Sequence, residues 1–371
     1  MKQNFPGYYR PSEEDFSKLW DDCIFSLDAN ILLNLYRYSP KTRTELLKIL
    51  TNISDRIWVP YQAAEEYQKN RLSVILKQEK AYEEMQKFIE EEQKKIESAL
   101  NSIIGKHPIM DDDHRQLWLK DINGIFNQLK DDIKTLKASH PDMFFNDTIR
   151  DELTSILNGK VGEPCSESDI GKIIEEGKRR YEKKVPPGWK DSGKDGGNLE
   201  DLQKYGDLIL WFQIIDKAKS AKKNIIFVTD DKKEDWWWKI EGKTIGPHYD
   251  LVKEFVFKTG FQFYMYQADP FMEFAKRYLD HDIDQTAIDE VKEIRTLDEE
   301  DAKKLMKVGA IDYSVDEDDP EDEERIYQIM TKIKRKLKEM PGITEEQAKL
   351  VSSQIAGKYG EDHELHIEFH N

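Results

Sequence analysis

The sequence predicts an α/β protein built on a mostly parallel sheet. Short runs of β-branched and aromatic residues recur along the chain, and segments with apolar residues every three or four positions lie between them. A helix that follows a strand returns the chain to the same edge of the sheet, so the next strand pairs with the first in parallel. A long charged helical stretch between the second and third strands predicts an insertion into this alternation.

The first predicted elements are two strands with helices around them. Residues 23–35 begin with an apolar run, continue through a polar turn and enter a helix. Residues 41–53 carry leucines at helical spacing and predict a second helix. The β-branched and aromatic run at residues 57–60 closes with a proline and predicts a second parallel strand.

The predicted insertion is an elongated helical hairpin. A helix that starts after the second strand continues to about residue 104, with charges of both signs and regularly spaced apolar residues. A second helical block spans about 114–138. Residues 139–200 are polar, rich in glycine and proline towards their end, and predict a loop. We place the whole insertion at about 75–180.

The alternation of helix and strand resumes after the insertion. A helix is predicted at residues 205–220, followed by a short β-branched strand in residues 224–231. The last strand is expected at residues 261–267 and a final helix at 271–281. These elements complete one domain, which we expect at residues 15–280.

Residues 281–371 predict a small, acidic, helical C-terminal extension. They contain about 13 basic and about 25 acidic residues and so carry about −12 of the net charge of −17. An acidic linker at 315–324 precedes two further predicted helices. The remaining 280 residues are nearly balanced in charge, so the acidity of the chain does not exclude a nucleic-acid partner for the domain.

Composition excludes several classes of protein. The chain has 371 residues, of which 38% are hydrophobic, enough for a sizeable core. No run approaches the roughly 18 apolar residues that span a bilayer, and the N-terminal stretch lacks an apolar signal segment. Cys23 and Cys165 are the only cysteines, which argues against a disulfide framework and against a zinc site. We expect a cytoplasmic protein without a membrane partner.

Acidic residues follow the predicted strands. Asp28 follows the first strand, Glu66 lies in the helix after the second, Asp207 lies near the start of a later helix, and Asp230 and Asp231 close the next strand. Because ligands gather at the carboxyl ends of parallel strands, these side chains are expected to converge. Clustered carboxylates need cations or protons, and their oxygens suit Mg²⁺ or Mn²⁺. Such ions activate water and stabilise the leaving oxygen in phosphodiester cleavage.

Each acid also has a purely structural interpretation. Asp28 is a candidate helix N-cap, and Asp207 is placed to favour a helix N-terminus through the macrodipole. Glu66 suits a solvated helix position, and either Asp230 or Asp231 suits a turn after a strand. Taken one at a time, these interpretations are preferable. Acids after three separate strands are less easily explained as independent caps, so the joint pattern favours a site.

Five segments in this order resemble the PIN-like nuclease domains, in particular the bacterial branch with a long helical insertion between the second and third acids. They are LDANILLNLYRYS, IWVPYQAAEEYQKNR, PPGWKD, YGDLILW and FVTDDKKEDWW. The resemblance covers about residues 15–275 and leaves the tail unmatched. It implies a PIN-like α/β/α sandwich with a central mostly parallel sheet, and divalent-metal-dependent cleavage of RNA, or of DNA as in the flap-nuclease relatives.

The resemblance also implies roles for individual residues. Asp28, Glu66 and Asp207 match the first three acids of the family, and Asp231 matches the fourth because the family pattern is threonine, any residue, aspartate. Asp230 is an alternative metal ligand. Glu65 is a less suitable second acid, since it would point about 100° around the helix.

Polar residues near the acids are candidates for substrate binding. Asn30 matches a family position that orients the first acid, and a role as a cap or turn residue is equally compatible with the sequence. Basic and amide side chains that suit a phosphate path are Arg37, Asn70, Arg71, Lys190 and Lys194.

Other residues of the same stretches have simpler interpretations. Lys232 and Lys233 also lie near the acids and could contact phosphate, but for these two we favour the interpretation that they offset local acids or lie in water. The run Trp236, Trp237 and Trp238 could stack on unpaired bases, but three adjacent indoles cannot all face one way, so at least one is expected in the core.

The functional hypothesis is therefore a Mg²⁺- or Mn²⁺-dependent nuclease that cleaves single-stranded RNA, with toxin action or phage defence as its setting. The alternatives are an inactive scaffold that binds nucleic acid or protein, a DNA nuclease, and a phosphatase on a similar sheet. The hairpin or the acidic tail is a candidate surface for self-association or for a regulatory partner.

Overall fold

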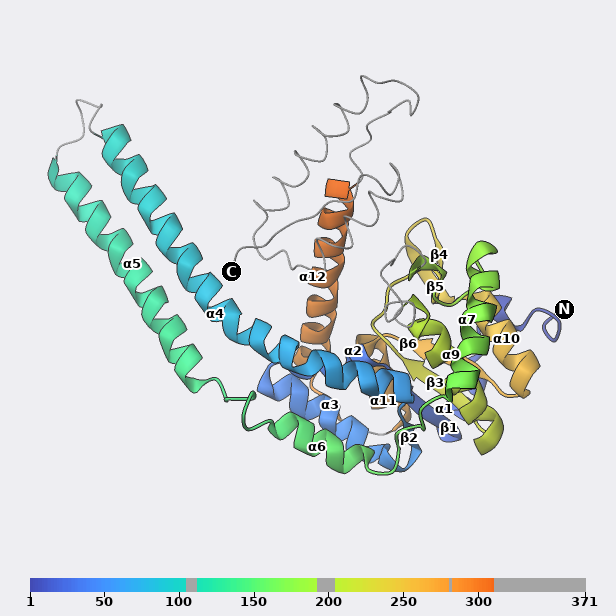
Figure 1. Cartoon of the computed structure of the whole chain (residues 1–371). Coiled ribbons are helices and arrows are strands. Elements are labelled where there is room, and N and C mark those ends of the chain that lie inside the picture. Colours follow the sequence, from blue (N-terminus) through green and yellow to red (C-terminus); the bar gives the residue numbers. More distant parts are fainter. Residues whose placement is uncertain (105–111, 192–203, 280–281, 310–371) are drawn as a thin grey trace, which may run out of the picture.

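The computed structural model describes residues 1–104, 112–191, 204–279 and 282–309 (Figure 1). Lys194, the acidic linker and the two helices expected beyond it lie outside the described residues. None of the described helices combines the length and the apolar composition that crossing a membrane requires.

The centre of the domain is a parallel sheet of four strands in the order β2-β1-β3-β6. The predicted runs form these strands because they are short, apolar and largely β-branched or aromatic. The strands are β1 (Cys23–Leu27), β2 (Ile57–Trp58), β3 (Asn224–Val228) and β6 (Phe263–Tyr266). The parallel sheet predicted from the sequence is confirmed.

Helices cover both faces of this sheet. Alternate side chains of β6 point to opposite faces: Phe263 packs on Trp211 of one helical layer, whereas Tyr266 packs on Trp20 of the other. Six helices form the two layers: α1 (Glu13–Asp21), α3 (Pro40–Asn52) and α11 (Ala268–Tyr278), and opposite them α7 (Glu167–Glu182), α9 (Gly206–Ala221) and α10 (Tyr249–Thr259). The α/β/α sandwich is confirmed.

The predicted helical hairpin is present and extends away from the sandwich (Figure 1). It consists of α4 (Tyr61–Ile104) and α5 (Asp112–Ser139), which contact each other along their length. A helix of 44 residues is roughly 66 Å long, far more than the sandwich needs to cover its sheet. Apolar side chains remain exposed on the hairpin, among them Phe88 and Ile125, each with 62% of its surface accessible.

The loop predicted for residues 139–200 is wrong over much of its length, because two helices lie within it. They are α6 (Thr148–Leu157) and α7. Asp147 and Ser166 accept hydrogen bonds from backbone amides as N-caps of these helices. Buried Ile149, Leu153 and Ile156 recur at helical spacing in α6, a weak apolar signal inside an otherwise polar stretch.

An antiparallel hairpin that the sequence did not reveal follows β3. It pairs β4 (Trp237–Ile240) with β5 (Lys243–Pro247) through a two-residue turn. Both turn residues have positive φ, 49° at Glu241 and 77° at Gly242, as tight hairpin turns require. Trp236 and Trp237 are buried, so a base-stacking role is wrong for these two tryptophans.

Three short elements and two helices complete the described fold. The short elements are η1 (Pro6–Tyr8), η2 (Ser54–Arg56) and η3 (Trp189–Asp191), and α2 (Ala29–Asn34) follows β1 directly. The helix α12 (Gln285–Gly309) contacts α3 and α11 and buries Ile288 and Val291 in the same core. The expected domain boundary near residue 280 falls just before α12.

Substitutions at two glycines of α7 test how this helix packs against α9. A Cβ added to Gly177 would lie 2.4 Å from the ring of Tyr205, whereas nothing lies within 4 Å of a Cβ at Gly171. Gly171→Ala is therefore expected to raise the free energy of unfolding by about 0.5–1 kcal/mol through helix propensity. Gly177→Ala is expected to lower it by about 1–3 kcal/mol through overpacking. Urea unfolding of both variants measures this, and equal effects would contradict the packing described.

Candidate functional site

The acids predicted from the sequence all lie at the carboxyl edge of the sheet. Asp28 immediately follows β1 and caps α2, where its Oδ1 accepts a hydrogen bond from the amide of Ala29. Asp231 lies just beyond β3, Asp207 lies in the first turn of α9, and Glu66 lies in the second turn of α4, just after β2. The parallel connections bring these strand ends and helix starts to one edge.

The electrostatics of Asp28 show that the four acids converge. Burial raises the pKa of the Asp28 carboxyl to about 8, and the charges of Glu66, Asp231 and Asp207 add to this increase. Glu66 is solvent-exposed, whereas Asp28 and Asp231 are half-buried. The cluster is therefore open towards α4 and closed towards the sheet.

Two polar side chains hold Asp28 in place. Thr229 Oγ1 donates to Asp28 Oδ2 over 2.5 Å, and Asn30 Nδ2 donates to the same oxygen over 2.7 Å. Asn30 Oδ1 in turn accepts from the amide of Asp230 over 3.0 Å, so Asn30 ties the end of β1 to the end of β3. The structure places Asn30 where it orients the first acid.

Lys233 lies in the middle of the acids. Its ammonium is 2.8 Å from Asp191 Oδ2, 3.0 Å from Asp207 Oδ2 and 3.2 Å from Asp231 Oδ2. Burial acts to lower its pKa, but the charges of Asp207, Asp231 and Asp191 prevail and raise the pKa of Lys233 well above its ordinary value. Of the two interpretations considered for this lysine, offsetting local acids describes its position.

Two further buried acids belong to this region and escaped the sequence analysis. Asp191 ends the PPGWKD segment, whose resemblance to the family was the one available signal for it. Asp235 accepts from the amides of Gly188 and Lys190 through Oδ2 and so holds this segment, while its Oδ1 is buried without a hydrogen-bond partner among the described residues. Burial raises the pKa of Asp235 to about 6.

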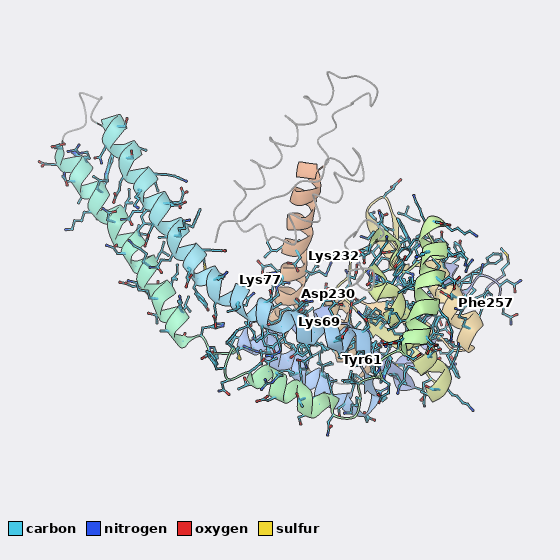
Figure 2. The ribbon with its side chains drawn as sticks, in the orientation of Figure 1. Tyr61, Lys69, Lys77, Asp230, Lys232 and Phe257 are labelled. Carbon is cyan, nitrogen blue, oxygen red and sulfur yellow. The ribbon has the colours of Figure 1, made fainter. Side chains whose placement is uncertain are left out.

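Asp230 is turned away from this cluster, in contrast to its predicted role as an alternative ligand. Its Oδ2 accepts from Asn34 Nδ2 over 2.9 Å, and its Oδ1 accepts from the amide of Ala268 at the start of α11. Figure 2 shows Asp230 and Lys232 near the base of α12, where Lys232 Nζ donates to the carbonyl of Arg295. Asp230 joins helices to the sheet and has no oxygen directed to the other acids.

The predicted phosphate path needs correction at two arginines. Arg37 forms two hydrogen bonds with Asp298 of α12, at 2.8 and 2.7 Å. Arg71 is buried and paired with Asp147, the N-cap of α6. Each guanidinium group pairs with a carboxylate that is distant in sequence and so links two parts of the fold. These pairs occupy the groups that were predicted to contact phosphate.

The two other predicted contacts that the structure describes reach solvent. Asn70 is exposed on α4. Lys190 pairs with Glu234 at 2.9 Å and lies 4.8 Å from the ring centre of Trp189, with part of its side chain accessible. The backbone amide of Lys190 donates to Asp235, which ties this residue to the buried acids of the region.

The chemistry of the donor set fits a hard dication. The four converging acids offer carboxylate oxygens, which Mg²⁺ and Mn²⁺ prefer. As the side chains stand, however, no three His, Cys, Asp or Glu residues of the described chain are arranged to hold a metal ion. Asp207 and Asp231 direct an oxygen each to the ammonium of Lys233 instead.

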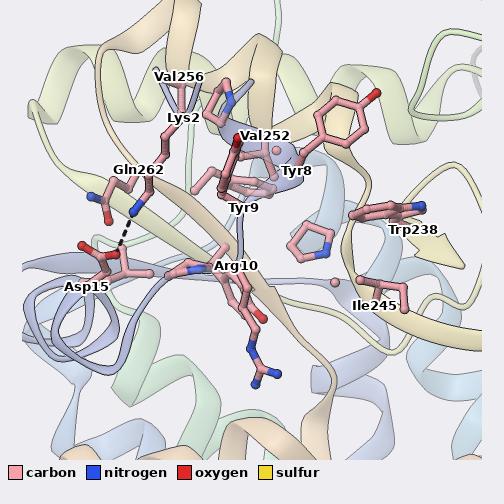
Figure 3. A pocket seen from close by; sticks show the side chains of 18 residues that line it. Lys2, Tyr8, Tyr9, Arg10, Asp15, Trp238, Ile245, Val252, Val256 and Gln262 are labelled. Atoms are coloured by element: carbon pink, nitrogen blue, oxygen red, sulfur yellow. Dashed lines mark hydrogen bonds and ion pairs between the residues drawn. The ribbon is translucent and has the colours of Figure 1, made fainter. Parts of the chain in front are cut away.

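A separate hollow of about 310 Å³ lies between the N-terminal residues, α10 and the β4–β5 hairpin (Figure 3). Tyr8, Tyr9, Trp238 and Val252 contribute to its largely apolar wall. None of the converging acids lines it. The one carboxylate that lines this hollow, Asp15, is paired with Lys2, so the hollow offers no group of acids comparable to the cluster at the sheet.

Comparison with known proteins agrees with this geometry. The family described as PIN like domain matches residues 24–251, a range that contains Asp28, Glu66, Asp207 and Asp231. No curated protein and no solved structure matches the chain. The matched range covers more than half of the sequence, and the chain belongs to the PIN-like domain family.

Proposed function

We propose that this protein is a nuclease that hydrolyses phosphodiester bonds with the aid of Mg²⁺ or Mn²⁺. Asp28, Glu66, Asp207 and Asp231 would hold the ion or ions. The convergence of these four acids at one edge of the sheet is the observation that carries the proposal. Members of the family are typically nucleases, so the family supports the same reaction class.

The residues around Asp28 prepare it for this role. Thr229 and Asn30 donate to one of its oxygens and fix its orientation. Such partners behind a ligand typically change metal affinity or activity by about 10–100-fold when they are removed. When bound, the metal would lower the pKa of a water molecule and stabilise the charge that develops on the phosphate. Attack of water on phosphorus would release a 3′-hydroxyl and a 5′-phosphate, as the family resemblance implies.

We favour single-stranded RNA as the substrate. Glu66 is the exposed member of the cluster, and Lys190 is exposed on the segment that Asp235 holds. Lys190 lies over the ring of Trp189, so a cation and an indole lie together on this segment. An indole that stacks on an unpaired base and an ammonium that contacts phosphate are the usual means of binding a single strand. The resemblance to bacterial PIN-like nucleases extends the proposal to toxin action or phage defence.

An inactive scaffold is the second candidate, and one observation favours it. Lys233 already neutralises part of the acidic cluster, which is compatible with a domain that binds no metal and has no activity. Against it stands the retention of all four family acids, together with the network that orients Asp28. Activity measurements separate the two candidates.

Replacement of the acids provides the first test of function. Asp28→Asn and Asp207→Asn are each expected to lower cleavage of an RNA oligonucleotide in Mn²⁺ by at least about 100-fold, because a neutral amide is a poor ligand for a dication. Asp216→Asn is the matched control. Asp216 lies on α9 as Asp207 does, but it is exposed and forms only a surface ion pair. Equal activity in all four proteins, wild type included, would exclude these acids from catalysis.

A substrate panel provides the second test. Labelled single-stranded RNA, single-stranded DNA, duplex RNA and a generic phosphate monoester are incubated with the protein in Mn²⁺ and in EDTA. We expect cleavage of single-stranded RNA in Mn²⁺, little cleavage in EDTA and no hydrolysis of the monoester. Preference for DNA would correct the substrate, and hydrolysis of the monoester alone would identify a phosphatase.

A further inference from the structure

We infer that Lys233 is a positioning residue, an internal counter-cation that holds Asp207 and Asp231 until a divalent metal displaces it and that then stays paired with Asp191. This inference rests on the proposed function, because it concerns the same acidic cluster. It adds two residues, Lys233 and Asp191, that lie outside the four acids of the family pattern.

The geometry shows that Lys233 is fully committed to the cluster. An ammonium has three N–H donors, and three carboxylate oxygens lie within 3.2 Å of Nζ. These oxygens come from Asp191, Asp207 and Asp231. The backbone amide of Lys233 also donates to Asp231 Oδ1 over 2.8 Å. The lysine is thus held from both its side chain and its main chain.

Charge explains why a cation is needed at this position. Carboxylates gathered away from water repel one another, and each raises the pKa of its neighbours. Lys233 offsets one negative charge in this cluster and is only 30% accessible at its side chain. Without it, Asp207 and Asp231 would face each other with no cation between them. The metal-free fold therefore depends on the ammonium.

A dication and the ammonium cannot use the same oxygens together. Mg²⁺ or Mn²⁺ would bind carboxylate oxygens at about 2.1 Å. The ammonium lies about 3 Å from one oxygen each of Asp207 and Asp231. Two cations that share these atoms would be separated by only a few ångströms and would repel strongly at low local dielectric. The finding that no three ligand-type side chains of the described chain are arranged for a metal agrees with this competition.

Asp191 offers Lys233 a partner that the metal does not need. It makes the shortest of the three ion pairs, 2.8 Å, and is itself nearly buried. Its position is fixed by the backbone of η3, where its amide donates to the carbonyl of Gly188 and Asp235 holds the preceding residues. Lys233 can release Asp207 and Asp231 and still remain paired, which keeps a positive charge beside the site.

Mn²⁺ binding to the full chain tests this inference. Titration calorimetry and the electron paramagnetic resonance signal of free Mn²⁺ both measure the affinity. Lys233→Met is expected to bind Mn²⁺ on the order of 10-fold more tightly than wild type, a change typical of residues behind the ligands. In EDTA the same variant is expected to melt at a lower temperature, and Mn²⁺ should restore the loss. If Lys233 only supported the fold, its replacement by Met would lower both the Mn²⁺ affinity and the melting temperature.

Two control variants isolate the contribution of the ion pairs. Lys232→Met removes the same charge from the adjacent residue, whose ammonium contacts the carbonyl of Arg295, and should leave Mn²⁺ affinity unchanged. Asp191→Asn deprives Lys233 of its remaining partner and should weaken Mn²⁺ binding. The double variant Lys233→Met with Asp191→Asn should bind as tightly as Lys233→Met alone, because Asp191 acts through the lysine.

The outcomes separate this inference from the proposed function. If Lys233→Met binds Mn²⁺ no more tightly than wild type, Lys233 does not compete with the metal and the inference is overturned, while a metal-dependent nuclease remains possible. If the affinities change as expected but no protein cleaves nucleic acid, the inference stands and the nuclease proposal fails. If Mn²⁺ binds to neither wild type nor Lys233→Met, both are overturned.

Discussion

The mutual repulsion of carboxylates at one edge of a parallel sheet is the constraint on which the rest of the site depends. Asp28, Asp207 and Asp231 can stay together only because donors and a cation lie among them. Thr229 and Asn30 supply the donors, and Lys233 supplies the charge. Such a cluster is expected to attract cations, since a dication would neutralise its negative charge more completely than one ammonium does.

The topology of the sheet explains how residues far apart in sequence meet. β1 and β3 are adjacent parallel strands, and their register pairs Leu27 with Val228 at the carboxyl end. The residues that follow, Asp28 and Thr229, are therefore neighbours, and the amide of Asp28 continues the ladder by donating to the carbonyl of Val228. A one-residue slip in this register would turn Asp28 away from Thr229. The core that fixes the register thus also fixes the site.

Much of the fold was predictable because its signals are local. Short apolar runs marked β1 and β3, helical periodicity marked α4 and α5, and acids after the strands marked the site. Helix α7 was missed because its apolar residues are few and lie in a polar, glycine-containing stretch.

The ion-pair partners of single side chains were not predictable, because these partners are distant in sequence. Arg37 pairs with Asp298, and Arg71 pairs with Asp147. In both pairs the partners are too far apart in sequence for their spacing to predict the contact. From the sequence, Lys233 could contact phosphate, offset local acids or lie in water, and only its three carboxylate partners in the fold distinguish these.

The most direct test is a crystal structure of the protein soaked in Mn²⁺, with the ion located by its anomalous scattering. We predict an anomalous peak bounded by oxygens of Asp28, Asp207 and Asp231, with the ammonium of Lys233 withdrawn to Asp191. A peak located elsewhere, or a cluster that keeps Lys233 between Asp207 and Asp231 at saturating Mn²⁺, would contradict this prediction.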